Sequence, residues 1–420
     1  MKKILLFLFV AVVGFMGCGE KKSELVESKT DVQVPTLKKV TFYLENSESM
    51  FGYVNGNNEY IKVISELSSK SDFVSDRVVK EFFLINGKTP LSVKPLGDIS
   101  SKLNSVLSVE GFNIGKTNSS ELNEMLKKAM ENSGNGKISI FISDGIFDIN
   151  QKSGNVDKYL TLESGVTKAN FIKRLSGSSS FETLLIKLNS NFNGKYFYAS
   201  RSGYEKINQK RPYYIWVFGD SQLVNKYFSE SFINQSLVGR TDYLRFMKLG
   251  SPLLKSRIIK GVNRKGEFDI EKDNPNIIKE AYKDKAGKFS FSFAVDFNSL
   301  PFSEVYLTDK NNFSIDNTNY EIGFIQKVND THRSFLPTKN KLDASHIITL
   351  ICKSNKTHIG SIYVKLKYTL PKWINTSLAV ETVQSPLTFG FDKLTSGISD
   401  AYIVYNQNKS LAEFKFQIKH

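Results

Sequence analysis

The chain has 420 residues, of which 40% are hydrophobic and 12% aromatic, so it can bury either one large core or two domain cores. It contains only two cysteines, which excludes a scaffold held together by several disulfides. The formal net charge is +15, but the lysines are spread through Asn- and Ser-rich stretches and form no dense block. We interpret this charge as a solvated surface with some attraction for anionic lipid, and not as a nucleic-acid-binding face.

The first eighteen residues have the layout of a secretory signal. Lys2 and Lys3 give a positive start, residues 4–13 are apolar, and Gly17 precedes Cys18 at the end. The apolar run is too short for a membrane-spanning helix, which needs roughly 20 residues. The segment resembles a lipobox, the signal of bacterial lipoproteins in which the cysteine receives lipid before cleavage. This resemblance implies a signal peptide over residues 1–18 and a lipid anchor on Cys18. The protein would then be held at the cell membrane or outer membrane, facing the periplasm or the exterior, and the chain would have no intramolecular disulfide.

Residues 19–36 are polar and lack apolar periodicity, which predicts a flexible tether. Strands and helices then alternate up to about residue 245, which predicts an α/β domain over 37–245 with a doubly wound, mostly parallel sheet. The expected strands cover 39–44, 77–85, 137–143, 181–188 and 213–218, and the expected helices cover 59–67, 119–130 and 222–228.

Beyond about residue 245 the pattern changes to short apolar and aromatic runs separated by turn residues, with little helical periodicity. This pattern predicts a β-rich, sandwich-like C-terminal domain over residues 246–420. The expected strands cover 289–297, 305–308, 320–325, 346–352, 360–368 and 412–418.

Three polar clusters lie next to expected strands or helices of the α/β domain. They are Glu45-Asn46-Ser47-Glu48-Ser49, Lys116-Thr117-Asn118 and Asp144-Gly145. Ligands of open α/β sheets bind at the carboxyl ends of the strands, where the first and third clusters are expected. Over about residues 38–229 the chain resembles the von Willebrand factor A domain, whose metal-ion-dependent adhesion site combines a first-strand DxSxS, a loop threonine and a later aspartate. The resemblance implies a site formed by Glu45, Ser47, Ser49, Thr117 and Asp144, with Glu45 standing where the family has aspartate.

The chemistry of this residue set agrees with the resemblance. Hydroxyl and carboxylate oxygens suit a hard cation, and Mg²⁺ takes only a few protein ligands while it keeps several waters. An open position on such an ion can accept a carboxylate from another protein. We therefore predict a membrane-anchored extracytoplasmic protein that binds an acidic residue of a protein partner through Mg²⁺. We expect neither catalysis nor nucleic-acid binding.

A catalytic alternative rests on two short motifs. Gly219-Asp220-Ser221 follows an apolar strand, and Asp343 stands three residues before His346. These motifs resemble the GDS and DxxH blocks of SGNH esterases, which implies a nucleophile at Ser221 that is activated by His346 and oriented by Asp343. In that family, however, the GDS block follows the first strand of the domain, whereas here it would follow the last strand of a sheet.

Overall fold

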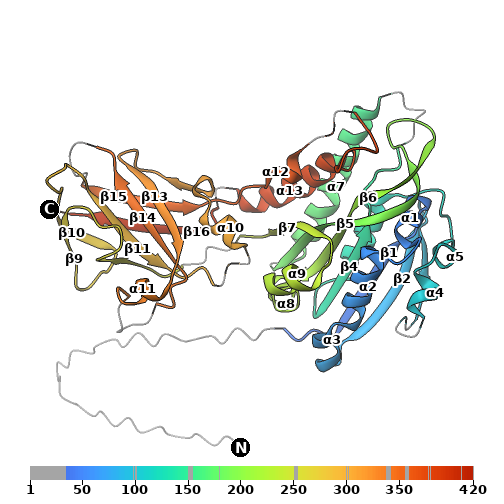
Figure 1. Ribbon diagram of the computed structural model, residues 1–420, viewed down its shortest axis with the longest axis horizontal. Coiled ribbons are helices and arrows are strands. Elements are labelled where there is room, and N and C mark those ends of the chain that lie inside the picture. The colour runs from blue at the N-terminus through green and yellow to red at the C-terminus, as the bar shows by residue number, and fades with distance from the viewer. Residues whose placement is uncertain are drawn as a thin grey trace, which may run out of the picture. The chain divides into compact units, whose positions relative to one another are not determined.

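The protein is described by a computed structural model (Figure 1). The description covers residues 35–420 except 98, 100–101, 150–154, 179, 250–253, 299, 301, 337–341, 355–358, 377, 379, 408 and 420. The expected signal segment, Cys18 and most of the expected tether lie outside the described residues. The chain from Pro35 onward forms one compact unit. Within the described ranges, no helix is both long enough and apolar enough to cross a membrane.

A seven-stranded mixed sheet organises the first half of the chain, in the order β3-β2-β1-β4-β6-β5-β7. β1 pairs in parallel with β2 and with β4, whereas the other neighbouring pairs are antiparallel. The α/β class predicted from the sequence is thus confirmed, with parallel pairing confined to β1 and its two neighbours. The strands are β1 (Lys39–Glu45), β2 (Val79–Asn86), β3 (Ser92–Pro95), β4 (Lys137–Ser143), β5 (Phe181–Phe197), β6 (Tyr204–Asp220) and β7 (Arg240–Met247).

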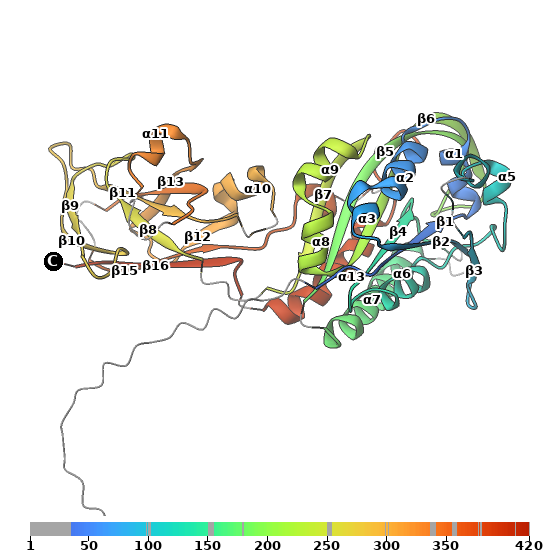
Figure 2. The same cartoon turned by 90° about the horizontal axis from the view of Figure 1, so that it is seen from below.

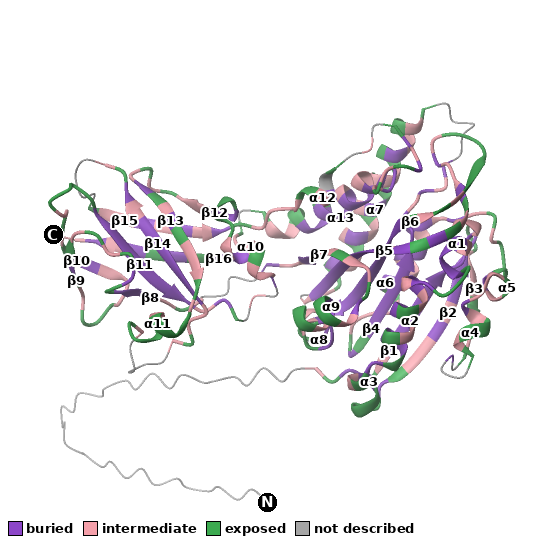
Figure 3. Ribbon diagram, in the orientation of Figure 1, coloured by how far each residue is buried: buried purple, intermediate pink, exposed green. Residues whose placement is uncertain are grey.

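Helices cover both faces of this sheet (Figure 2). Successive side chains of a strand point to opposite faces, so Phe42 of β1 lies in one core and Tyr43 in the other. Figure 3 shows the buried residues that result along the central strands. The helices over the Phe42 face are α1 (Phe51–Val54), α2 (Glu59–Ser69), α3 (Ser71–Ser75), α4 (Leu103–Val106), α5 (Val109–Phe112), α8 (Ser221–Tyr227) and α9 (Glu230–Ser236). Those over the Tyr43 face are α6 (Leu122–Glu131), α7 (Val156–Ser176), α12 (Lys372–Asn375) and α13 (Phe391–Asn406).

The strands β5 and β6 are much longer than the sequence predicted. They form a hairpin whose turn is residues 198–203, and a short turn requires the two strands to run antiparallel. β4 pairs with β6 only as far as Tyr214, and β7 pairs with β5 only as far as Leu188. The outer part of the hairpin therefore extends beyond the rest of the sheet (Figure 1).

The β-rich segment forms two further sheets, in the orders β12-β15-β16-β10-β9 and β13-β14-β11-β8. The two sheets enclose one core, in which Phe293 of β11 lies 4.4 Å from Phe416 of β16 between ring centroids. The sandwich-like arrangement predicted for this segment is therefore present. Its strands are β8 (Ser256–Ile259), β9 (Glu267–Ile270), β10 (Ile277–Tyr282), β11 (Ser290–Val295), β12 (Phe313–Ile315), β13 (Tyr320–Lys327), β14 (His346–Cys352), β15 (Gly360–Leu366) and β16 (Ala412–Ile418), with the short helices α10 (Glu304–Thr308) and α11 (Asp330–Arg333).

Two features of the C-terminal segment differ from the prediction. Residues 305–308, predicted as a strand, belong to helix α10, because the Ser303 hydroxyl accepts a hydrogen bond from the backbone N–H of Tyr306 and caps that helix. Helix α13 lies between β15 and β16 in the chain but packs in the core of the large sheet, where Phe391 stacks on Tyr214 at 3.8 Å. The segment 246–420 therefore also supplies a helix to the α/β core.

A buried ion pair joins the last two strands of the large sheet. Glu182 of β5 is 0% exposed and Arg245 of β7 is 3% exposed, and the guanidinium also donates to the carbonyl oxygen of Phe228. Burial raises the pKa of Glu182, and the charge of Arg245 opposes that shift. The opposite charges of Glu182 and Arg245 therefore offset the free-energy cost of burying each group away from water.

We expect Arg245→Met to lower the free energy of unfolding by about 3–5 kcal/mol, because it leaves the Glu182 carboxyl buried without a counter-charge. The double variant Arg245→Met/Glu182→Leu should recover most of that loss, and urea unfolding measures both. Lys260→Met, which breaks the exposed pair of Lys260 with Asp269, is the control and should leave the free energy of unfolding nearly unchanged. A double variant as unstable as the single one would contradict this account.

Candidate functional site

Two carboxyl groups from neighbouring strands meet at the carboxyl edge of the large sheet. β1 and β4 run parallel with Leu44 opposite Ile142, so Glu45 and Asp144 emerge at the same edge. Glu45 is 1% exposed and Asp144 is 3% exposed. The strand pairing therefore brings together the two carboxylates that the sequence predicted for the metal site.

Serine hydroxyls surround these carboxyl groups. The Ser47 hydroxyl donates to Oε1 of Glu45 at 2.8 Å and lies 3.0 Å from the Ser49 hydroxyl. Ser49 is in turn hydrogen-bonded to the side chain of Asp144. The two serines of the first loop thus form a chain of hydroxyls that links one carboxylate to the other.

Burial of the two carboxyl groups changes their acidity. The pKa of Glu45 is raised to about 7, chiefly by burial and then by the charge of Asp144, while the hydroxyls of Ser120, Ser143 and Ser47 oppose the shift. Burial also raises the pKa of Asp144, against hydrogen bonds from Ser49 and from the backbone N–H of Ile146. The raised pKa values show that ionising these two adjacent carboxyl groups is unfavourable. A cation bound between them would offset that cost.

The loop that carries Thr117 is fixed by two buried asparagines. Asn46 donates to two backbone carbonyls of this loop, at 2.7 and 2.8 Å, and Asn86 accepts a hydrogen bond from the backbone N–H of Lys116 at 2.9 Å. Gly115 has φ +91°, and a Cβ there would lie 2.4 Å from the Ser92 hydroxyl. The carbonyl oxygen of Thr117 then accepts from the backbone N–H of Glu48 at 2.8 Å, which joins the two loops. Thr117 is therefore held next to the first loop, and it lines the same pocket as Ser47 and Ser49.

The sequence analysis did not include Ser120. Its hydroxyl donates to Oε1 of Glu45 at 2.7 Å, and its side chain is buried. The available signal was the polar run from Thr117 to Ser120 directly before helix α6, from which the resemblance selected only the threonine. Its contact with Glu45 adds a fourth hydroxyl to the set.

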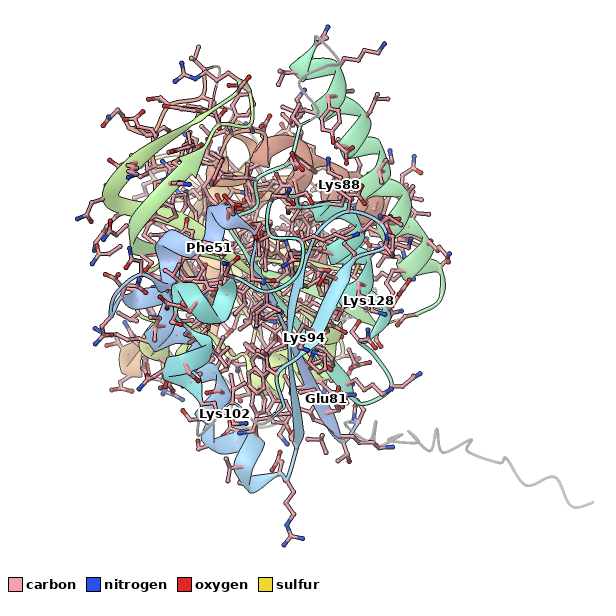
Figure 4. All side chains as sticks on the ribbon, turned by 90° about the vertical axis from the view of Figure 1, so that its right-hand side faces the viewer. Phe51, Glu81, Lys88, Lys94, Lys102 and Lys128 are labelled. Carbon is pink, nitrogen blue, oxygen red and sulfur yellow. The ribbon has the colours of Figure 1, made fainter. Side chains whose placement is uncertain are left out.

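A pocket of about 280 Å³ opens over the hydroxyl cluster. Its rim includes Asp148, which pairs with Lys88 (labelled in Figure 4) at 3.3 Å. The tip of the β5–β6 hairpin supplies another part of the wall. The lining residues are Ser47, Glu48, Ser49, Thr117, Asn118, Ser119, Ser120, Ile146, Phe147, Asp148, Ile149, Phe197, Tyr198, Ala199 and Gly203.

The hairpin tip is held in place by one carboxylate, which the sequence analysis also did not identify. Glu381, which is 6% exposed, accepts hydrogen bonds from the Tyr196 hydroxyl at 2.8 Å and from the backbone N–H groups of Ala199 at 3.0 Å and Ser200 at 2.7 Å. No local sequence signal pairs residues so distant along the chain. Glu381 thereby fixes the turn that forms the pocket wall.

The donor set can be compared with what a cation requires. Within the described ranges there is no group of three or more His, Cys, Asp or Glu residues arranged to hold a metal ion, so hydroxyls would have to complete any site here. Oε2 of Glu45 is buried and makes no hydrogen bond of acceptable geometry, although the Ser143 hydroxyl is near enough to affect its pKa. A buried oxygen without a hydrogen bond among hydroxyls and a second carboxylate fits a hard cation.

The residues of the esterase alternative do not contact one another in the part of the chain that the structure describes. Ser221 begins helix α8 after β6, and β6 runs antiparallel to β4, so this serine lies at the edge of the sheet opposite to Asp144. The two ring nitrogens of His346 lie 2.8 Å from the Ser345 hydroxyl and 3.0 Å from Oε1 of Glu304. No hydrogen bond or ion pair between described atoms connects His346 with Ser221 or with the side chain of Asp343.

Fold and site together define a mixed α/β domain with a carboxylate and hydroxyl cluster at the carboxyl edge of its central strands, joined to a two-sheet β-sandwich. Comparisons of this chain with protein-family models, with curated proteins and with solved structures found no match.

Substitution of the residue that holds the hairpin tip gives a stability prediction. Glu381→Ala should lower the free energy of unfolding by about 2–4 kcal/mol, because it leaves the buried N–H of Ala199 without an acceptor. Glu381→Gln keeps an acceptor oxygen and should cost less than Glu381→Ala in the same urea titration. Equal losses for the two variants would show that the hydrogen bonds do not fix the turn.

The raised pKa of Glu45 predicts a pH dependence of stability in the presence of a chelator. The folded-state pKa of about 7 lies above the ordinary glutamate value of 4.5, so the folded state holds the proton more tightly than the unfolded chain. The free energy of unfolding should therefore fall as the pH rises from about 5 to about 7. Glu45→Gln should flatten this part of the profile, measured by urea unfolding at several pH values. A variant with the slope of the wild type would contradict the assignment.

Proposed function

We propose that the protein is a lipid-anchored, extracytoplasmic binding protein whose α/β domain is of the von Willebrand factor A type. In this proposal it binds an acidic residue of a protein partner through Mg²⁺. The observation that carries the proposal is the convergence of Glu45, Ser47, Ser49 and Asp144 at the carboxyl edge of β1 and β4. Their spacing in sequence and their hydrogen bonds in the fold agree with the same oxygen-rich site.

Each residue has a distinct part in holding the cation. Ser47, Ser49 and Thr117 would offer hydroxyl oxygens from two loops that are hydrogen-bonded to each other. Glu45 and Asp144 would supply negative charge from below, and neutralisation by the cation would relieve the unfavourable burial of two carboxylates. When bound, Mg²⁺ supplies an open coordination position for a carboxylate ligand, and the pocket above the cluster leaves room for such a side chain.

The cation proposal is tested on the full chain by thermal unfolding and isothermal titration with MgCl₂. Wild-type protein should bind Mg²⁺ and melt several degrees higher in its presence, because a ligand specific for the folded state adds stability of about 2.7 kcal/mol at one hundred times its Kd. Asp144→Asn and Ser47→Ala should lose at least tenfold in affinity while they stay folded.

Asp148→Asn is the matched control, since it removes the same charge from the rim of the same pocket. KCl at equal ionic strength is the control for screening. If Mg²⁺ produces no heat and no shift in melting temperature beyond that of KCl, the cation part of the proposal is wrong. If Asp148→Asn loses the response as fully as Asp144→Asn, the ligand assignment is wrong.

A further inference from the structure

Among the residues that the structure describes, no further strand pairs with the outer half of the β5–β6 hairpin. Residues 189–197 of β5 and 204–212 of β6 form strand pairs only with each other, because β4 stops at Ser143 opposite Tyr214 and the β7 ladder ends at Leu188. A two-stranded ribbon is marginally stable in water, so an exposed one needs other support. Here the support comes from Glu381 at the turn and from α1, where Gly52 and Gly194 allow close approach of the two backbones.

The hairpin extends past the same sheet edge as the candidate metal site. β6 passes Ser143 at Tyr214, so the part of the hairpin beyond Tyr214 lies on the Asp144 side of the sheet. The tip then lines the pocket through Phe197, Tyr198 and Gly203. A ligand in the pocket would therefore lie beside this tip.

The exposed surface of the hairpin tip is cationic and aromatic. The Arg201 guanidinium lies 3.9 Å from the ring centroid of Tyr198, and Lys195 Nζ lies 4.6 Å from that of Tyr204. Stacking on an aromatic face holds a cation in place without neutralising it. The acidic residue of the turn region, Glu205, accepts a hydrogen bond from the Tyr198 hydroxyl at 2.6 Å.

Positive charge therefore predominates at this tip. Lys195, Arg201 and Lys206 are exposed there, and none of them forms an ion pair with a described carboxylate. Lys210, further down the strand, is paired with Glu59 at 3.5 Å. Exposed cations that do not pair with carboxylates form a surface that attracts an anionic partner.

We propose that the hairpin tip binds an acidic segment of the partner polypeptide, next to the residue that the cation would hold. This inference rests on the proposed function, because it places the second contact at the wall of the same pocket. An acidic polypeptide fits better than a nucleic acid or a membrane. The proposed function already places a carboxylate of a protein partner on the cation, and further carboxylates along the same polypeptide can be spaced so that they meet the cationic tip.

The test uses the full chain and a fluorescent peptide of alternating Glu and Gly residues, with a Gln and Gly peptide of the same length as control. Fluorescence anisotropy is measured in Mg²⁺ and in EDTA at two salt concentrations. We expect Arg201→Ala/Lys206→Ala to weaken binding of the acidic peptide roughly three- to tenfold, in Mg²⁺ and in EDTA alike, and to reduce its salt dependence. Lys94→Ala/Lys102→Ala removes the same charge from β3 and from the start of α4 (Figure 4) and should bind as the wild type does.

The outcomes separate this inference from the proposed cation site. Loss of binding in EDTA together with an unchanged Arg201→Ala/Lys206→Ala variant overturns the inference and leaves the cation site standing. Weaker binding by that variant, with no effect of EDTA or of Asp144→Asn, supports the hairpin surface and refutes the cation site. Vesicles of phosphatidylglycerol or single-stranded DNA that bind through Arg201 and Lys206, when the acidic peptide does not, overturn the inference in favour of a phosphate ligand. Circular dichroism verifies that every variant is folded.

Discussion

The parallel pairing of β1 with β4 is the constraint on which the site depends, because it places Glu45 and Asp144 at one edge of the sheet and buries both. Two buried carboxylates repel each other and lose hydration, a cost that hydrogen-bond donors or a cation must offset. Neighbouring hydroxyl and amide groups offset part of this cost or position the groups that do. Ser47 and Ser120 donate to Glu45, Ser49 bonds to Asp144, and the loop that presents Thr117 is fixed by the buried amides of Asn46 and Asn86.

In the second half of the large sheet, β6, β5 and β7 pair antiparallel, and the turn of the β5–β6 hairpin forms part of the pocket wall. β5 follows β4 through helix α7 and runs in the same direction as β4, but it lies beyond β6, which is antiparallel to both strands. β5 and β6 are joined by a short turn, so the two strands of this hairpin can lengthen together beyond the sheet. The extension passes the carboxyl edge of β4 and ends over the hydroxyl cluster. Glu381 then fixes the turn of this hairpin. Glu381 lies in the segment just before α13, the C-terminal helix that packs in the α/β core, so the C-terminal part of the chain also shapes the pocket.

What the sequence predicted and what it did not can be separated on physical grounds. Short apolar and aromatic runs predicted β1 and β4, helical spacing of apolar residues predicted α2, and the spacing of Glu45, Ser47 and Ser49 placed three oxygen-bearing side chains at the first strand end. Helix α7 was not predicted: its buried residues Leu160, Thr167, Phe171 and Leu175 lie on one face, but Thr167 is polar, and the apolar residues Leu162 and Val166 are exposed, so the apolar residues alone do not show the helical pattern. The outer hairpin is rich in Asn, Lys and Gln and has the composition of a loop. Ser120 and Glu381 act on residues 75 and 182 positions away, which no local pattern encodes.

Glu45 stands where the motif behind the proposed site has an aspartate, and the structure shows what the longer side chain contacts. Its extra methylene moves the carboxylate by about 1.5 Å relative to an aspartate. In this fold that displacement is met by the Ser120 hydroxyl, which reaches Oε1 at 2.7 Å from the start of α6. An aspartate at this position would shorten the reach toward Ser120, and one buried oxygen would lose a donor. The length of the Glu45 side chain and the presence of Ser120 are therefore coupled, because Glu45 reaches the Ser120 hydroxyl only with its extra methylene. A substitution at residue 45 should be compared in proteins that keep Ser120.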